Sequence, residues 1–275
     1  MSTALAVRHG RFGRAAIYRL NRAFLTHAHR EGHLTFHLEG EAARITVAGV
    51  PYPLDPGSAL AIDPWQPHSF DLGTLDNDDV VALVLYIAPT WFLGDNQTGQ
   101  CLRFGRPIVA VSPSVAPLVH RLGRLLLGEA ESNDFEGHLR DLTSACFEQT
   151  WSRIAVPLPP PQSQTYRDYR IRNSIRLMQK RIGDELAIDL IARDVGLSRP
   201  HFYKLFRQHV GITPNIFLNT LRMEAAIDRL TQSSDPVTSI GLDLGFASQA
   251  SFTRFFCTNV GVPPSDYRRV AFCRT

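Results

Sequence analysis

Four histidines in the N-terminal part of the chain have the chemistry and the spacing to hold a ligand. His27, His29 and His33 occur within one short segment, and His68 follows further along. A neutral imidazole can hydrogen-bond a small molecule, and several converging imidazoles can coordinate zinc or nickel. We predict that these side chains bind a small-molecule effector. Two alternatives stay open: a metal site made by the same residues, and buried histidines with a structural role only.

A second group of polar side chains lies in a segment that the chain contains twice. Residues 198–214 (SRPHFYKLFRQHVGITP) align with residues 248–264 (SQASFTRFFCTNVGVPP), with matching serine, phenylalanine, valine, glycine and proline positions. In each copy apolar residues recur at every fourth place, which predicts a helix with one buried face. Donors suited to base edges and phosphates occupy the opposite face, and these are Arg199, Tyr203, Lys204, Arg207, Gln249, Ser251, Thr253 and Arg254.

The residues that precede each copy predict a helix-turn-helix unit. A small residue, Ala192 or Gly241, allows a first helix to approach the second closely. Four residues later a glycine can adopt a positive φ and end that first helix sharply. Ser198 or Ser248 is then placed to cap the second helix. The duplication of the whole device, with its polar outer face, favours DNA binding over a simple packing repeat.

The elements around these residues differ between the two halves of the chain. Residues 24–90 predict short strands with Gly and Pro turns, which is typical of a barrel or jelly roll. Apolar stripes over 115–126 and 135–146 predict two helices that pack on this barrel, the first of them also a candidate dimer contact. The second half has helical periodicity throughout, and its long helix over 214–232 joins the two helix-turn-helix units.

Composition and charge limit the possible functions. Residues 165–275 hold 16 Lys and Arg against 10 Asp and Glu, whereas residues 1–164 hold 13 against 16, so the basic half favours a polyanionic partner. The sequence has neither a membrane-length apolar run nor the pattern of a signal peptide, so we expect a cytoplasmic protein without membrane contact. The four cysteines are far apart and form no C-x-x-C pair, which disfavours a zinc or disulfide framework.

The second copy carries motifs that resemble those of the AraC/XylS family, I-G-x-x-x-G-F-x-S-Q-x-x-F-x-R-x-F at 240–256 and G-x-x-P-x-x-Y-R at 261–268. The resemblance covers about residues 170–270. It implies that each unit places its second helix in a major groove, with successive grooves about 34 Å apart. It also implies base-facing positions at Pro200, Tyr203, Lys204, Gln249, Ala250, Thr253 and Arg254. Pro200 and Ala250 can offer only apolar side-chain contacts, for example to thymine methyl groups.

The N-terminal histidines resemble a cupin pattern, in which H-x-H is followed by a Pro-Gly turn and a later histidine. The resemblance covers about residues 20–90 and implies a sensor domain. Metal-binding cupins usually carry a carboxylate a few residues after H-x-H, but here His33 has that place and Glu31 is too near His29. An iron site of two histidines and a carboxylate is therefore disfavoured, while an all-histidine site for zinc or nickel remains open.

Together these features predict an α+β multidomain protein. Residues 1–155 form a cupin-like β-barrel or jelly roll with two helices, for effector binding and dimerisation. Residues 156–166 are a Pro-rich linker, and residues 167–275 form an all-α domain of two helix-turn-helix subdomains. We predict a sequence-specific transcriptional activator that acts as a homodimer with duplex DNA, a small-molecule effector and RNA polymerase. We expect no enzyme activity, metal or cofactor, and the alternative is a metal-dependent cupin enzyme with a helical appendage.

Overall fold

The computed structural model describes residues 2–72, 79–94, 102–151, 168–184 and 188–272. The predicted linker at 156–166 lies outside the described residues, as do Cys101 and Cys273. Ten strands and three helices make up the described N-terminal part: β1 (Thr3–Gly10), β2 (Gly13–Leu20), β3 (Phe24–His27), β4 (Gly32–Gly40), β5 (Ala43–Val47), β6 (Val50–Leu54), β7 (Ser58–Ile62), β8 (His68–Asp71), β9 (Val80–Ile87), α1 (Pro89–Leu93), β10 (Ile108–Ala110), α2 (Ala116–Leu127) and α3 (Phe135–Trp151).

The strands form two antiparallel sheets that face each other, as the barrel prediction expected. The larger sheet has the order β1-β2-β9-β4-β7-β10, and the smaller has the order β3-β8-β5-β6. Sequence analysis placed strands only from residue 24 onward, and it missed β1 and β2. Both are paired over their length, β1 with β2 and β2 with the central strand β9.

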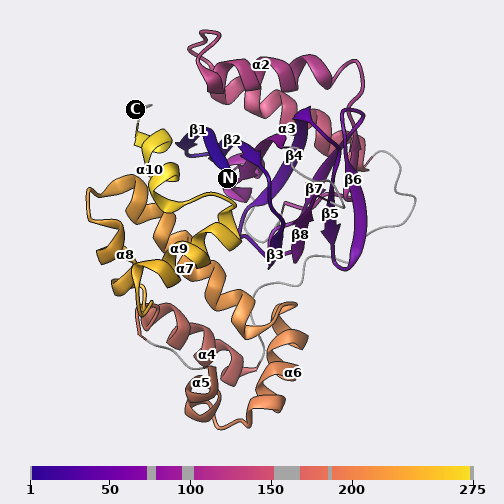
Figure 1. Cartoon of the computed structure of the whole chain (residues 1–275). Helices are drawn as coiled ribbons and strands as arrows, with labels where there is room; N and C mark the ends of the chain where they lie inside the picture. The colour runs from indigo at the N-terminus through magenta and orange to yellow at the C-terminus, as the bar shows by residue number, and fades with distance from the viewer. Residues whose placement is uncertain (1, 73–78, 95–101, 152–167, 185–187, 273–275) are drawn as a thin grey trace.

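The larger sheet is buried on both faces. Its central strand β9 has no exposed residue, which explains its continuous apolar sequence. Alternate β9 residues such as Val81 and Leu83 pack with α2 and α3, which cover this face in Figure 1. The intervening residues, such as Ala82 and Val84, face the interior between the sheets. The apolar stripe of α2 is therefore used in packing on the barrel.

The second half of the chain is helical, as predicted. Its elements are α4 (Tyr169–Lys180), α5 (Ile188–Asp194), α6 (Arg199–Val210), α7 (Pro214–Gln232), α8 (Val237–Asp243), α9 (Gln249–Val260) and α10 (Pro264–Phe272). The long helix α7 starts at Pro214, and the Thr213 side chain caps it by accepting a hydrogen bond from the Ile216 amide. Helices α4 to α6 form a first subdomain, and α8 to α10 form a second one at the other end of α7 (Figure 1).

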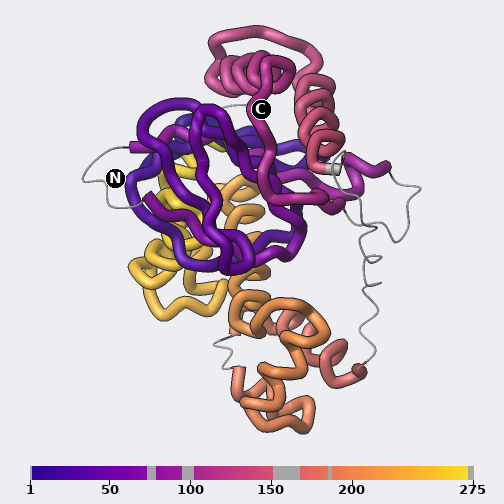
Figure 2. The backbone as a smooth tube through the Cα atoms, turned by 90° about the vertical axis from the view of Figure 1, so that its right-hand side faces the viewer, coloured from indigo at the N-terminus to yellow at the C-terminus, as the bar shows by residue number. Residues whose placement is uncertain are grey.

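The two subdomains relate to the barrel in different ways. The first has a core largely of its own, built around Phe202 and Phe206. The second shares one continuous apolar cluster with the interior of the barrel, including Phe252, Phe256 and Tyr267. Figure 2 shows the first subdomain extending away from the barrel, on the side opposite α2. Within the described part of the chain, none of the helices has the length and apolar character required to cross a membrane.

Candidate DNA-reading helices and effector site

The first helix-turn-helix unit consists of α5 and α6. Gly196 has a φ of +73° between the two helices, and this conformation is readily available to glycine. Phe202 and Phe206 are fully buried on the inner face of α6. Ser198 occupies the N-cap position, but its side chain makes no capping hydrogen bond, which corrects the sequence-based prediction. Pro200 follows within the first turn and has no amide hydrogen, so this turn has one fewer donor to satisfy.

The outer face of α6 is available to a partner. Arg199, Pro200, Lys204 and Arg207 are exposed, and Tyr203 is half-buried. The Arg199 guanidinium is 3.1 Å from a carboxylate oxygen of Asp189 and lies 5.6 Å from the centre of the Tyr203 ring. Lys204 and Arg207 have no ion pair among the described residues. This face therefore presents two unpaired cations together with an aromatic ring.

The second unit consists of α8 and α9, and it has the closer helix contact. A Cβ atom on Gly241 would lie 2.8 Å from the Phe252 side chain, so only glycine fits this crossing without a shift. Gly245 has a φ of +80° in the turn. The Ser248 hydroxyl accepts a hydrogen bond from the Ser251 amide, and the Ser251 hydroxyl accepts one from the Ser248 amide. This reciprocal cap confirms the prediction for Ser248.

The outer face of α9 is also accessible. Ser248, Gln249, Ala250 and Arg254 are exposed, while Ser251 and Thr253 are half-buried. The Thr238 hydroxyl donates to the side-chain oxygen Oε1 of Gln249 at 2.6 Å, which leaves the side-chain NH₂ group of Gln249 as a donor. The Ser251 hydroxyl is engaged in the cap and is poorly placed to contact a base. Gln249, Thr253 and Arg254 therefore carry the polar contacts that this helix can offer.

Sequence analysis missed one cation beside this face. The segment between β2 and β3 brings Arg22 and Ala23 to the edge of a hollow whose other walls include Gln249, Thr253 and Arg254 of α9. Arg22 lies far from α9 in the sequence, and no motif connects them. The structure thus places a second guanidinium group, from the barrel, next to the second reading helix.

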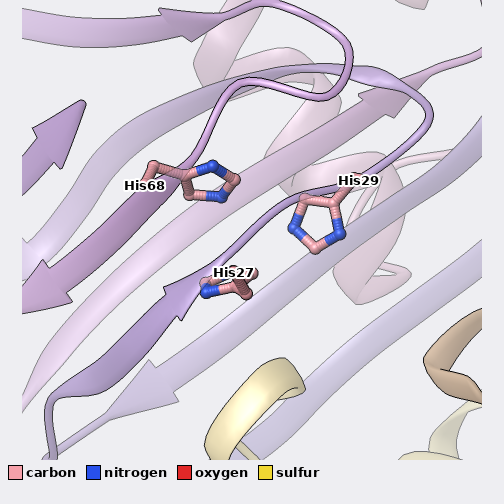
Figure 3. Close-up of side chains that lie close together, drawn as sticks. All are labelled: His27, His29 and His68. Carbon is pink, nitrogen blue, oxygen red and sulfur yellow. The ribbon is translucent and has the colours of Figure 1, made fainter. Parts of the chain in front are cut away.

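The four predicted histidines do converge, inside the barrel. His27 ends β3, His29 follows it, His33 lies at the start of β4 and His68 begins β8. All four side chains are buried. Figure 3 shows His27, His29 and His68 pointing toward one another, and each offers a nitrogen within 4.8 Å of the others. The His33 ring centre is 4.5 Å from that of His68 and 5.5 Å from that of His29.

Hydrogen bonds orient two of these rings. The Nδ1 atoms of His27 and His68 lie 2.8 Å from the carbonyl oxygens of Leu25 and Gln66, and because a carbonyl can only accept, each Nδ1 carries the proton. In the neutral ring Nε2 then holds a lone pair. Burial lowers the pKa of His33 to about 3 and lowers the pKa values of the other three histidines, so all four are neutral at neutral pH.

A buried arginine that sequence analysis did not identify lies nearby. The Arg14 Cζ atom is 3.7 Å from the centre of the Tyr86 ring, and its guanidinium group reaches the hydroxyl of Tyr267 on α10 at 3.5 Å. Tyr86 in turn contacts the His29 and His33 rings edge-on. A chain of aromatic and cationic groups therefore runs from the histidines to the last helix of the second subdomain.

The histidine site is closed on one side by the helical domain. A cavity of about 40 Å³ has His27, His33 and His68 in its wall, together with Asn259 and Val260 from the end of α9. The Thr220 hydroxyl on α7 lies 3.0 Å from the carbonyl oxygen of Ala28 and 2.9 Å from that of Ile216, so the two carbonyls share its one proton. The segment that carries His27 and His29 is therefore in direct contact with α7.

Further contacts hold α7 against the barrel. Trp65 stacks on Phe217, with ring centres 5.1 Å apart and planes inclined by 14°. Arg30 lies 2.9 Å from a carboxylate oxygen of Glu224. Because Phe217 also belongs to the core of the first subdomain, both subdomains have a contact with the barrel close to the histidines.

Comparisons with known proteins agree with this two-domain arrangement. A cupin domain model matches residues 19–86, and a helix-turn-helix domain model matches residues 191–270. The regulatory protein PocR of Salmonella typhimurium is 27% identical over 139 residues, which cover 48% of this chain and 46% of PocR. The transcriptional activator RhaS of Escherichia fergusonii is 30% identical over 102 residues, which cover 37% of each chain. The matches thus span about a third to a half of these curated relatives.

Solved structures extend the similarity of fold to nearly the whole chain. A crystal structure of ToxT from Vibrio cholerae is similar with a TM-score of 0.54 and 16% identity, over 94% of this chain and 97% of that one. Wild-type ToxT with a bound unsaturated fatty acid gives a TM-score of 0.53, over 93% and 94% of the two chains. The chain therefore combines a cupin domain with a helix-turn-helix domain, in a two-domain fold similar to that of ToxT.

Proposed function

We propose that this protein is a sequence-specific DNA-binding regulator of transcription whose barrel senses a small effector. The observation that carries the proposal is the pair of exposed polar faces on α6 and α9, each backed by buried phenylalanines. A helix held in this way, with donors on its outer face, is what insertion into a major groove requires. The relatives PocR and RhaS are a regulatory protein and a transcriptional activator, which disfavours the enzyme alternative.

The DNA-contacting residues are proposed from exposure and donor chemistry. In α6 they are Lys204, Arg207 and Tyr203, and in α9 they are Gln249, Thr253 and Arg254. Ser198, Ser248, Arg199 and Ser251 flank these positions, and they suit phosphate contacts or helix capping better than base contacts. Pro200 and Ala250 lie on the exposed face as apolar contacts.

Effector control follows from the packing of the second subdomain. The histidine site lies where β3, α7 and α9 meet, so an occupant that favours one placement of α9 shifts the balance between DNA-binding and non-binding arrangements. The wall formed by Asn259 and Val260 connects the site to the reading helix itself. This short route distinguishes the second unit from the first.

The proposal also covers the sign of regulation, the oligomeric state and the location in the cell. We include activation of transcription through contact with RNA polymerase, because RhaS is an activator by name. We also include a homodimer, with a location in the cytoplasm where DNA is accessible. Since the apolar stripe of α2 packs on the barrel, a dimer contact through this helix would use its exposed residues, such as Arg121 and Arg124.

A binding-site selection tests this function. The full chain is mixed with random duplexes, bound sequences are recovered, and the affinity for the selected duplex is measured at several salt concentrations. We expect one preferred sequence, a footprint of about two helical turns, and an affinity that falls steeply with salt through counterion release. Binding without sequence preference, or affinity that does not depend on salt, contradicts the proposal.

A further inference from the structure

We infer that the effector is a divalent transition-metal ion of the zinc or nickel class, bound by the nitrogens of His27, His29 and His68, with His33 as the fourth ligand. The effect of the metal on DNA binding rests on the proposed regulator function, whereas the metal site itself does not. Four nitrogens around an ion with bonds of about 2.0–2.1 Å lie about 3.3 Å from one another. The nitrogens of His27, His29 and His68 already lie within 4.8 Å, so small ring rotations close the set.

Unpaired buried nitrogens are the first argument. His29, His33 and His68 are buried, with only 3–5% of each residue exposed. Within the described chain no hydrogen-bond partner is found for either ring nitrogen of His29, for Nδ1 of His33 or for Nε2 of His68. A buried polar atom without a hydrogen-bond partner destabilises the folded protein. A purely structural cluster would carry several such costs together, whereas one central ion would give each histidine a partner.

The orientation of the rings is the second argument. Ligating histidines commonly donate the other ring N–H to a backbone carbonyl, which fixes the tautomer and the direction of the lone pair. His27 and His68 have this arrangement, with Nδ1 donating to the carbonyl oxygens of Leu25 and Gln66. Their Nε2 atoms are left as the metal-binding nitrogens.

The size of the site is the third argument, and it separates an ion from an organic effector. Sites for small molecules typically have volumes of about 300–1,000 Å³. The cavity beside the histidines measures about 40 Å³. The space is therefore small for a sugar or a fatty acid, and such a ligand would require the wall of the cavity to rearrange.

The donor set selects the class of ion. Imidazole nitrogens suit zinc, nickel and copper, whereas magnesium and calcium require oxygen ligands. The buried Arg14 guanidinium lies on the Tyr86 ring next to this site and opposes a second positive charge. We therefore expect the ion to exchange reversibly, as a sensor site requires, instead of being locked in during folding.

The link to DNA binding is built into the ligand segment. Ala28 lies between two ligands, and its carbonyl oxygen accepts the hydrogen bond from Thr220 of α7. When His27 and His29 close around an ion, this carbonyl moves and the position of α7 on the barrel changes. Helix α7 joins the two helix-turn-helix units. Metal binding should thereby change the affinity for DNA.

The experiment uses the full chain, stripped of metal with a chelator and then dialysed against zinc, nickel or magnesium chloride. We expect about one zinc or nickel ion per chain and no retained magnesium. His29→Gln and His68→Gln should bind zinc at least about tenfold more weakly. His120→Gln, an exposed histidine on α2, is the matched control and should bind zinc as the unaltered protein does. Equal zinc binding in all four proteins would identify an adventitious surface ion and overturn the inference.

The affinity for the selected duplex, with and without zinc, tests the regulatory part. We expect a change of about 5- to 150-fold, the usual range of allosteric coupling, and no change in His29→Gln. Thr220→Val should keep the zinc stoichiometry and reduce the coupling, which a variant that merely misfolds would not do. Zinc binding with unchanged DNA affinity overturns the sensor role. Failure of DNA binding under all conditions instead overturns the proposed function and leaves the zinc stoichiometry as an independent result.

Discussion

At the scale of single residues, the cations on α6 and α9 could be predicted from the sequence, but the buried contact between Arg14 and Tyr267 could not. Lys204 and Arg254 were identified because they lie opposite phenylalanines at helical spacing, and both are exposed. The four histidines were found from their spacing and a family pattern. Arg14 and Tyr267 lie at opposite ends of the chain, so no local pattern could show that they meet.

Removing one cation from either reading helix should weaken specific binding. Lys204→Ala and Arg254→Ala should each cost about 1–3 kcal/mol if the side chain contacts a base. The measurement is fluorescence anisotropy with the selected duplex and with single-base variants of it. Arg11→Ala is the control, because Arg11 is exposed in the β1–β2 turn, outside the helical domain. Unchanged affinity and site preference in both test variants would remove these residues from the interface.

A buried carboxyl group should make stability depend on pH. Burial raises the pKa of Asp63 to about 6, although its carboxylate accepts a hydrogen bond from the Phe104 amide and lies near Arg103. A raised pKa in the folded state means that the contribution to stability is present below about pH 4 and is lost as the pH rises through 6. Asp63→Asn should thus be more stable than the unaltered protein at pH 7.5, by at most about 3 kcal/mol.

Urea unfolding at pH 7.5 and pH 5 measures this effect. The advantage of Asp63→Asn should shrink at the lower pH, because the unaltered carboxyl group is then largely protonated in the folded protein. An equal difference between the two proteins at both pH values would show that the carboxylate is well accommodated in the fold.

At the scale of elements, periodicity predicted those that are buried on one face. Helices α2, α3 and α7 agree with the predicted ranges because each has a distinct apolar side. Strand β2 was missed because both of its faces are buried, so polar residues do not alternate with apolar ones. Its alanines also have a low intrinsic preference for strands. The turn glycines were predicted, since a positive φ is a local requirement that the sequence shows directly.

The two N-cap serines provide a matched pair at this scale. Ser248→Ala removes a reciprocal cap at the start of α9 and should destabilise the protein by about 1 kcal/mol. Ser198→Ala removes a hydroxyl that makes no capping bond in α6, so it should cost clearly less. Chemical unfolding of both variants, with equal denaturant dependence, measures the difference. Equal losses would mean that the caps contribute little and that the buried phenylalanines alone define where these helices start.

At the scale of the whole molecule, the second helix-turn-helix unit packs directly on the barrel and shares an apolar cluster with its interior. Sequence analysis divided the chain at the proline-rich segment and treated the helical half as one domain. Contacts between distant segments join these two parts: the Ala4 amide donates to Asp266, and the Gly261 turn packs against the Phe24 ring. Each is a pairing of surfaces, and neither has a local signature in the sequence. The barrel and the second helix-turn-helix unit, to which we assign sensing and DNA binding, are thereby joined through α9 and α10.

This arrangement predicts that damage to the barrel wall reaches one reading unit before the other. Phe24 stacks on Phe70, with ring centres 5.1 Å apart, and also supports the turn between α9 and α10. Because the ring is partly buried, we expect Phe24→Ala to lower the local stability of α9 and α10 by about 1–2 kcal/mol, or roughly tenfold faster amide exchange. Helices α5 and α6 should keep their protection, since their core is separate. Hydrogen-exchange mass spectrometry resolves these peptides, and Leu25→Ala is the control because that side chain is 72% exposed. Equal deprotection of α6 and α9 would mean that the helical half unfolds as one unit, and coupling from the barrel would then have to act on both reading helices together.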